Sequence, residues 1–311
     1  GGPVGTLNIP VPNFLGFGKD VSLSGTVSRV NYSGALSYRD NFFFDTNLRF
    51  FANVSAGYSN LSQSQAFSIP QRKTFYGGEL GLGYYFGHNL SLTGSYGLSW
   101  IKAEPSFSTL TTTTPNPFLS EYNRTGLTSR ITLNLIYDSR DSMFPTSGMY
   151  HTLKLELADQ YIGSSVNYFS LLSIFKFYVP LNKRQFPLAQ DRDKRVVWRT
   201  KIYNEFIVSR SSSGVPMDLR STGLDYGANF PEPLVRGAGW LGSQFYFPNS
   251  LDAAATKQTY PIGANWLVGI NTELAFPIIP KIGLEGFVFL DVGNGFNIES
   301  KWCNSLQGSL A

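Results

Sequence analysis

The sequence predicts an all-β chain that forms a transmembrane antiparallel β-barrel, and three observations carry this prediction. Only 15% of the 311 residues are charged, whereas a soluble domain carries about 25%. Glycine (31 residues) and aromatic side chains (15%) are both abundant. Apolar and polar residues alternate along many segments, and no apolar run approaches the ~18 residues of a membrane-spanning helix. Together these features exclude a helical membrane bundle and a disordered chain.

The rare residue types limit the chemistry that the chain can perform. Cys303 is the only cysteine, and His88 and His151 are the only histidines. A disulfide scaffold is therefore excluded, and we expect no metal and no cofactor. The net charge of +4 is spread along the chain without a basic arm, so nucleic acid is not an expected partner. The sequence contains no nucleophile-elbow, zinc-protease or phosphate-loop motif. We therefore expect that the protein is not an enzyme.

Period-two alternation marks the expected strands. One face of the 90–100 segment is apolar and the other is serine, threonine and glycine; its apolar members are Leu90, Leu92, Tyr96, Leu98 and Trp100. A soluble sandwich would alternate in the same way, but these segments reach the ~9–11 residues of a tilted membrane strand. Aromatic residues at the strand ends also fit an interfacial girdle. We expect a partial strand before Phe14 and strands at 21–30, 33–43, 48–58, 75–86, 90–102, 127–137, 149–161, 165–179, 195–208, 265–276 and 283–291.

Short and long connections alternate between these strands. Residues 87–89 form a tight turn, whereas 59–74 and 103–126 are long and rich in serine and threonine. Outer-membrane barrels have short periplasmic turns and long outer loops. The longest connection, 209–264, is therefore predicted to be an extracellular loop that folds into the barrel.

Several short motifs occur in a recognisable order. NFLGFGK (13–19) and RDNFFFD (39–45) lie near the start, and DSRDSMFPTSG (138–148) lies in the middle. The tetrapeptide LVRG (234–237) is followed by TELAFP (272–277) and FLDVGN (289–294). This series resembles the barrel of the BamA-type outer-membrane assembly family, although Ala238 stands where that family has an aromatic residue.

The resemblance implies a specific architecture and role. It implies a barrel of sixteen strands when complete, of which this sequence holds about 12, with the first missing or incomplete and the chain ending in the antepenultimate strand near 306–309. Periplasmic POTRA domains, which precede the barrel in that family, are absent from 1–311. The implied function is to fold and insert client proteins in the outer membrane of a Gram-negative-type bacterium, through a lateral gate between the first and last strands. Implied partners are outer-membrane lipids, unfolded barrel clients, periplasmic chaperones and accessory lipoproteins.

Arg236, between Val235 and Gly237, is the sharpest candidate site residue. Alternation turns Glu273 and Asp291 inward on neighbouring strands. A guanidinium can donate directed hydrogen bonds to two carboxylates, and Gly237 lets the loop backbone pass close to the wall. The resemblance implies the same contact, which locks the loop inside the barrel. The alternative is a solvated loop arginine.

A second candidate is the turn after the 127–137 strand. Its residues are Asp138, Arg140, Asp141, Phe144, Pro145 and Gly148. Proline presets φ and glycine permits a positive φ, which is turn chemistry. The turn is therefore either a salt-bridged periplasmic contact for accessory lipoproteins or simply a well-capped turn.

Two other functions stay open at this stage. A secretion or import transporter of the same superfamily would share the loop arginine. An unrelated porin would not need that arginine, and would use inward residues such as Arg199, Lys201 and Glu205 for ion selection. Hydrated lumen residues are the simpler interpretation of those three.

Overall fold

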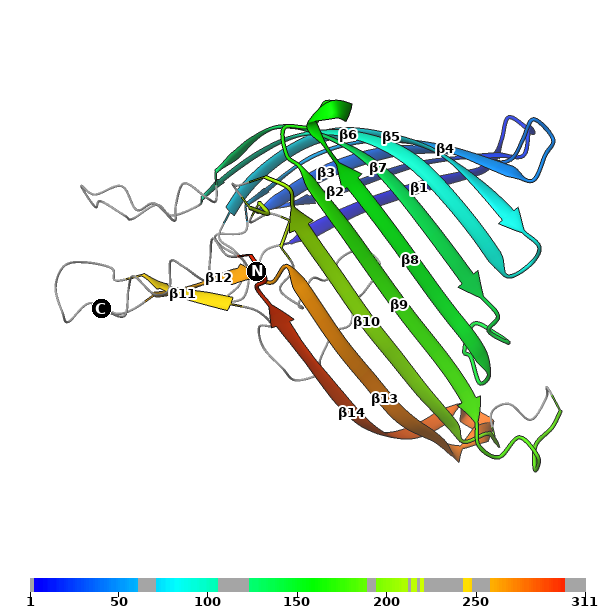
Figure 1. Ribbon diagram of the computed structural model, residues 1–311. Helices are drawn as coiled ribbons and strands as arrows, with labels where there is room; N and C mark the ends of the chain where they lie inside the picture. The colour runs from blue at the N-terminus through cyan, green and yellow to red at the C-terminus, as the bar shows by residue number, and fades with distance from the viewer. Residues whose placement is uncertain are drawn as a thin grey trace.

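The computed structural model describes residues 3–60, 71–105, 123–188, 194–211, 214–216, 219–220, 243–247 and 258–299. Twelve strands form one antiparallel sheet in the order β1 to β10, β13 and β14 (Figure 1), and β11 and β12 form a separate hairpin. The strands are β1 (Val4–Phe14), β2 (Lys19–Ser28), β3 (Asn31–Phe43), β4 (Leu48–Asn60), β5 (Gln71–Phe86), β6 (Leu90–Pro105), β7 (Arg124–Asp138), β8 (Gly148–Ala158), β9 (Tyr168–Pro180), β10 (Val197–Ser209), β11 (Ser243–Phe247), β12 (Gln258–Gly263), β13 (Trp266–Ile279) and β14 (Leu284–Phe296). Short 3-10 turns η2 (Gln160–Ile162) and η5 (Pro280–Ile282) follow β8 and β13. No helix in these ranges is long and apolar enough to cross a membrane.

The fold confirms the all-β antiparallel prediction, and the expected strands match the observed ones closely. The expected partial strand before Phe14 is the full strand β1. The largest difference is at β14, which continues to Phe296 rather than ending at 291. In the opposite direction, β8 ends at Ala158 rather than continuing to 161. Asp159 ends it by accepting a hydrogen bond from the Tyr161 backbone and starting the turn η2, which closes at Gly163 with φ of 87°.

The sheet has an apolar outer face and a polar inner face. Along β7, Ile131 and Leu133 are 40% and 46% exposed, whereas Thr128 and Thr132 on the opposite face are 2% and 7% exposed. A soluble domain shows the reverse arrangement, because its apolar face is the one removed from water. Polar residues inside and apolar residues outside are the arrangement of a membrane barrel.

The connections lie on two opposite rims. We call the rim with 15–18, 44–47, 87–89, 139–147, 181–196 and 280–283 the turn rim, and the rim with 29–30, 61–70, 106–123, 159–167 and 210–265 the loop rim. Most connections on the turn rim are short and most on the loop rim are long. Two depart from the pattern: 29–30 is a short turn on the loop rim, and 181–196 is the longest connection on the turn rim.

The described sheet is curved but open, with β1 and β14 at its two ends (Figure 1). Each neighbouring pair of strands is joined by a long antiparallel ladder, such as the one that runs from Gln71↔Pro105 to Phe86↔Leu90 without a shift. β1 contains Pro10 and Pro12. Because proline lacks a backbone donor, it is tolerated best in a strand that has a neighbour on one side only.

Candidate functional site

The long connection after β10 turns toward the inner face as it begins. Val215 is only 2% exposed and belongs to a buried apolar cluster. The other members of this cluster are Ala158, Tyr168 and Ile207. Tyr168 and Ala158 are directly opposite one another in the β8–β9 ladder, and the Tyr168 hydroxyl reaches the inner carboxylate of Glu156 at 2.5 Å. The start of the connection is therefore packed against the inside of the wall.

Arg220 fastens this segment to the end of β14. Its side chain is fully buried, and Nη2 donates to Glu299 Oε2 at 2.5 Å. Nη1 donates to Asn297 Oδ1 at 3.2 Å, and Nε donates to the Val215 carbonyl at 3.2 Å. Glu299 also accepts from the Val215 backbone amide at 2.8 Å. A buried guanidinium with several directed bonds thus ties the long connection to the chain that follows β14.

The two acids predicted to receive the loop arginine lie on the inner face. Asn271 stands opposite Asp291 in the β13–β14 ladder, and Glu273 is two residues further along β13. Residues opposite one another, and residues two apart on a strand, point to the same side of a sheet. Glu273 and Asp291 therefore share one face, as alternation requires.

Glu273 has a partner in the wall itself. Arg199 on β10 is directly opposite Glu273 and approaches Oε1 at 3.3 Å through Nη1. The same guanidinium reaches Glu285 Oε2 at 3.0 Å through Nη2. One arginine thus links β10, β13 and β14. The sequence interpretation of Arg199 as a merely hydrated lumen residue missed this pair, although the matching inward parity of Arg199 and Glu273 was a usable signal.

Val235, Arg236 and Gly237 lie outside the described residues. The contact of Arg236 with Glu273 and Asp291 therefore stays a prediction. Arg220 is the buried arginine of the long connection in the described part of the chain, and no sequence motif marked it.

The turn after β7 is a compact, internally bonded unit. Arg140 donates to Asp138 through Nε at 2.9 Å and Nη2 at 2.7 Å, and its guanidinium lies 4.6 Å from the centre of the Tyr150 ring. The hydrogen bonds to Asp138 raise the pKa of Arg140 above its ordinary value, so the guanidinium stays charged. Asp141 accepts from the Thr146 hydroxyl at 2.7 Å and from the backbone amides of Thr146 and Ser147 at 2.9 and 3.2 Å. Asp138, Arg140 and Asp141 therefore hold the turn together.

Arg195 joins this turn to the next one on the same rim. It is 7% exposed and donates to the Thr146 hydroxyl at 3.2 Å. It also caps three carbonyls of the 181–196 connection, at distances of 3.0 to 3.2 Å: those of Phe186, Pro187 and Leu188. Phe144, by contrast, is 85% exposed just before Pro145. Loop sequences have no periodicity from which the role of Arg195 could be predicted.

Gly148 offers a direct test of the turn geometry. Its φ is +104°, and a Cβ at this position would overlap the Ser139 carbonyl oxygen. We predict that Gly148→Ala destabilises the barrel by more than the ~1–3 kcal/mol of a strained backbone alone, measured as the urea midpoint of the full-length protein folded in vesicles. Gly163→Ala is the matched control, because its φ is +87° but nothing lies within 4 Å of the added carbon. Equal midpoints for the two variants would contradict the overlap.

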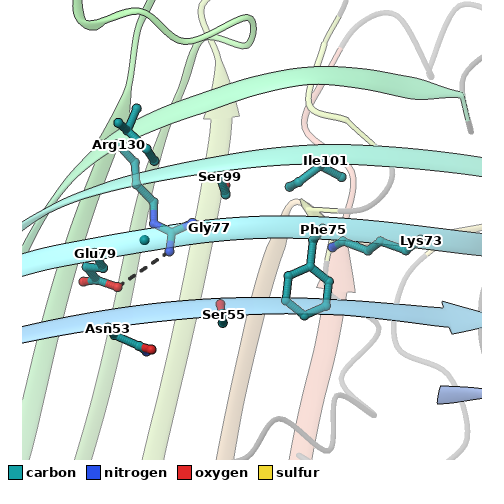
Figure 2. Close-up of a pocket in the computed structure, with 11 residues that line it drawn as sticks. Asn53, Ser55, Lys73, Phe75, Gly77, Glu79, Ser99, Ile101 and Arg130 are labelled. Atoms are coloured by element: carbon teal, nitrogen blue, oxygen red, sulfur yellow. Dashed lines mark ion pairs between the residues drawn. The ribbon is translucent and has the colours of Figure 1, made fainter. Parts of the chain in front are cut away.

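Charged residues also brace the inner wall between β5 and β8. Arg130 on β7 lies 3.8 Å from Glu79 on β5 (Figure 2). It also lies 3.8 Å from Glu156 on β8. Lys154 approaches Glu156 at 3.1 Å. The Arg130–Glu79 pair borders a cavity of about 350 Å³, which is also lined by Asn53, Lys73, Phe75 and Ser99. The Arg130–Glu79 contact connects the non-adjacent strands β5 and β7, and the Arg130–Glu156 contact continues the link to β8, so the network resists shear of the wall.

The fold and this interior define an antiparallel barrel of the outer-membrane type. Residues 13–308 match the Omp85 superfamily domain. The chain therefore belongs to the Omp85 superfamily.

Solved structures give the same fold. The fold is similar to that of BamA from Haemophilus ducreyi lacking POTRA domains 1-3, with a TM-score of 0.76, 23% identity and coverage of 98% of this chain and 57% of that one. It is less similar to CdiB from Acinetobacter baumannii, with a TM-score of 0.52, 12% identity and coverage of 96% and 47%. A comparison with curated protein sequences finds no significant match. The chain thus spans little more than half the length of the BamA chain that it resembles.

Proposed function

We propose that this chain is the barrel of an outer-membrane protein assembly factor, which folds client β-barrel proteins and inserts them into the outer membrane of a Gram-negative-type bacterium. The observation that carries the proposal is the likeness to BamA, at a TM-score of 0.76 over 98% of the chain, against 0.52 for CdiB. The ordered motifs support it: they lie at the β1–β2 turn, the end of β3, the β7–β8 turn, β13, β14 and the long connection.

The proposed work is mechanical, and the protein is not an enzyme. A strand edge with free backbone donors and acceptors is a template for strand addition. Such an edge is unfavourable in lipid, where no water can satisfy it. A lateral gate between the first and last strands of the complete barrel would therefore favour pairing with a client strand. Neither a nucleotide nor a metal is needed for this exchange.

The residues described above would keep the rest of the wall intact while the edge strand at the gate pairs with a client strand. The Glu79–Arg130–Glu156 contacts connect β5, β7 and β8, and Arg199 connects β10, β13 and β14. These bonds lie away from β1, so the wall can stay braced while strand pairs elsewhere open. The proposed partners are outer-membrane lipids, unfolded barrel clients, periplasmic chaperones and accessory lipoproteins.

The test uses the full-length protein in liposomes together with an unfolded outer-membrane barrel as client. We predict faster client folding than in empty liposomes, and loss of most of this acceleration in Arg236→Ala, because the long connection would no longer be held to Glu273 and Asp291. Arg29→Ala is a control, since Arg29 is an exposed arginine on the loop rim. The folded fraction of the client, followed over time, is the measurement.

The alternatives predict different results. A secretion or import transporter of the superfamily would export or import one partner without accelerating unrelated clients. A porin would give steady ion conductance that Arg236→Ala does not abolish. Either result, without client acceleration, would overturn the assembly function.

A further inference from the structure

The connection between β9 and β10 is unusual for its rim. It runs from 181 to 196 and follows β9 at the lower right of Figure 1. It carries five basic residues (Lys183, Arg184, Arg192, Lys194 and Arg195) and two acidic ones (Asp191 and Asp193). No other connection on the turn rim has a net charge above +1. A long, basic connection among short, nearly neutral ones suggests a role beyond joining two strands.

The first part of this connection is fixed by its own backbone. The Asn182 carbonyl accepts from the backbone amides of Gln185 and Phe186 at 3.0 and 3.2 Å. The Asn182 side chain accepts from the Val196 amide at 2.8 Å and donates to the Lys194 carbonyl at 3.2 Å. With the three carbonyls capped by Arg195, these bonds order the backbone that carries Lys183 and Arg184.

Lys183 and Arg184 are exposed on this ordered backbone and form no ion pair with any described residue. A concavity of about 690 Å³ lies beside them, lined by Pro180, Leu181, Asn182, Lys183, Arg184 and Gln185. Two cations at a preformed hollow are suited to an anion, and an arginine can donate two parallel bonds to phosphate oxygens.

The apolar surroundings specify which anion fits. The outer face of β9 runs through Phe177 and Val179 and continues beyond the strand end to Leu181. Val179 is 39% exposed and Leu181 is 58% exposed. Leu188 in the same connection is 55% exposed. Basic groups directly beyond a lipid-facing strand lie at the height of the phospholipid headgroups.

We propose that Lys183 and Arg184, in the hollow at the start of the 181–196 connection, bind the phosphate of an anionic phospholipid whose acyl chains lie against Val179 and Leu181. The site needs the sheet to span a membrane but does not depend on the assembly function. It would hold the turn rim at a fixed depth relative to one leaflet.

The test compares lipid retention by the full-length protein and by Lys183→Gln/Arg184→Gln. Each protein is released from detergent micelles that contain equal amounts of phosphatidylglycerol and phosphatidylcholine, and bound lipid is counted by native mass spectrometry. We expect the wild type to prefer phosphatidylglycerol, and the preference to fall about fivefold for each cation removed, or about 25-fold for both. It should also weaken as salt shortens the screening length from about 10 Å at 0.1 M to about 3 Å at 1 M.

The control is Arg29→Gln/Arg72→Gln, which removes the same charge from two exposed residues at the opposite end of the sheet. An equal loss in this control would overturn the site in favour of a general charge effect. If inorganic phosphate at a matched concentration displaces the lipid, the site binds a free anion rather than a phospholipid, and the proposal is overturned. If the wild type shows no preference for phosphatidylglycerol, the proposal is overturned, and an acidic protein becomes the better candidate partner for the basic surface. Because lipid retention is measured rather than client folding, failure here is distinct from failure of the assembly function.

Discussion

Arg220→Ala is expected to release the start of the long connection and to destabilise the barrel strongly. The substitution removes the buried cation and leaves Glu299 partly buried with an uncompensated charge. Breaking one partner of a buried ion pair costs about 3–5 kcal/mol. The full-length protein folded in vesicles should show a lower urea midpoint and faster protease cleavage within 209–264.

Arg210→Ala provides the matched control. Arg210 lies in the same segment and pairs with Asp159 at 3.6 Å, but its side chain is 69% exposed. An exposed pair contributes about 0–1 kcal/mol, so this variant should resemble the wild type. If cleavage and midpoint change equally in both variants, Arg220 has no special role.

A double substitution separates the loss of the pair from the loss of packing. Arg220→Met with Glu299→Leu removes both charges and leaves apolar side chains of similar length. Replacing a buried ion pair by apolar residues is often nearly neutral, whereas removing one partner is not. The double variant should therefore be more stable than Arg220→Ala. Greater instability of the double variant would show that the bond from the Val215 amide to Glu299, which only the double variant loses, outweighs the removal of the uncompensated charge.

The strands could be predicted because their side chains obey a period of two over long segments. A membrane strand must present apolar groups to lipid at every second position, so the pattern at 90–100 or 131–137 is repeated along the whole wall. Strand ends were less predictable. β8 stops at Ala158 because Asp159 bonds to the Tyr161 amide, and a single capping contact of this kind leaves no periodic trace.

The site was predictable only where it lies on strands. The inward direction of Glu273 and Asp291 follows from alternation, and so does that of Arg199. Arg195 and Arg220 lie in connections, where no periodicity indicates the direction of a side chain. Arg220 meets Glu299 across 79 residues of sequence, and Arg195 meets Thr146 across 49. Contacts of this kind depend on how the rims are assembled, which one sequence does not encode in a local pattern.

The ion pair of Glu273 with Arg199 changes how the predicted Arg236 contact should be tested. Exchanging charges between Arg236 and Glu273 would place a new arginine next to Arg199, whose Nη1 is now 3.3 Å from the carboxylate. Repulsion between these two cations would mask any rescue. Asp291 is the better partner, because the residue opposite it on β13 is the neutral Asn271.

Arg236→Glu is expected to abolish protection of the 209–264 connection, because it directs an acid toward Glu273 and Asp291. Adding Asp291→Arg restores one attraction and should recover part of the protection, whereas adding Glu273→Arg should not. Contacting residues typically show a coupling of about 0.5–3 kcal/mol in a double-mutant cycle, here measured from protease cleavage rates of the full-length protein in vesicles. Additive damage with Asp291→Arg would contradict direct contact. Equal rescue by Glu273→Arg would show instead that Arg199 moves aside, and that the wall pair is weaker than its geometry suggests.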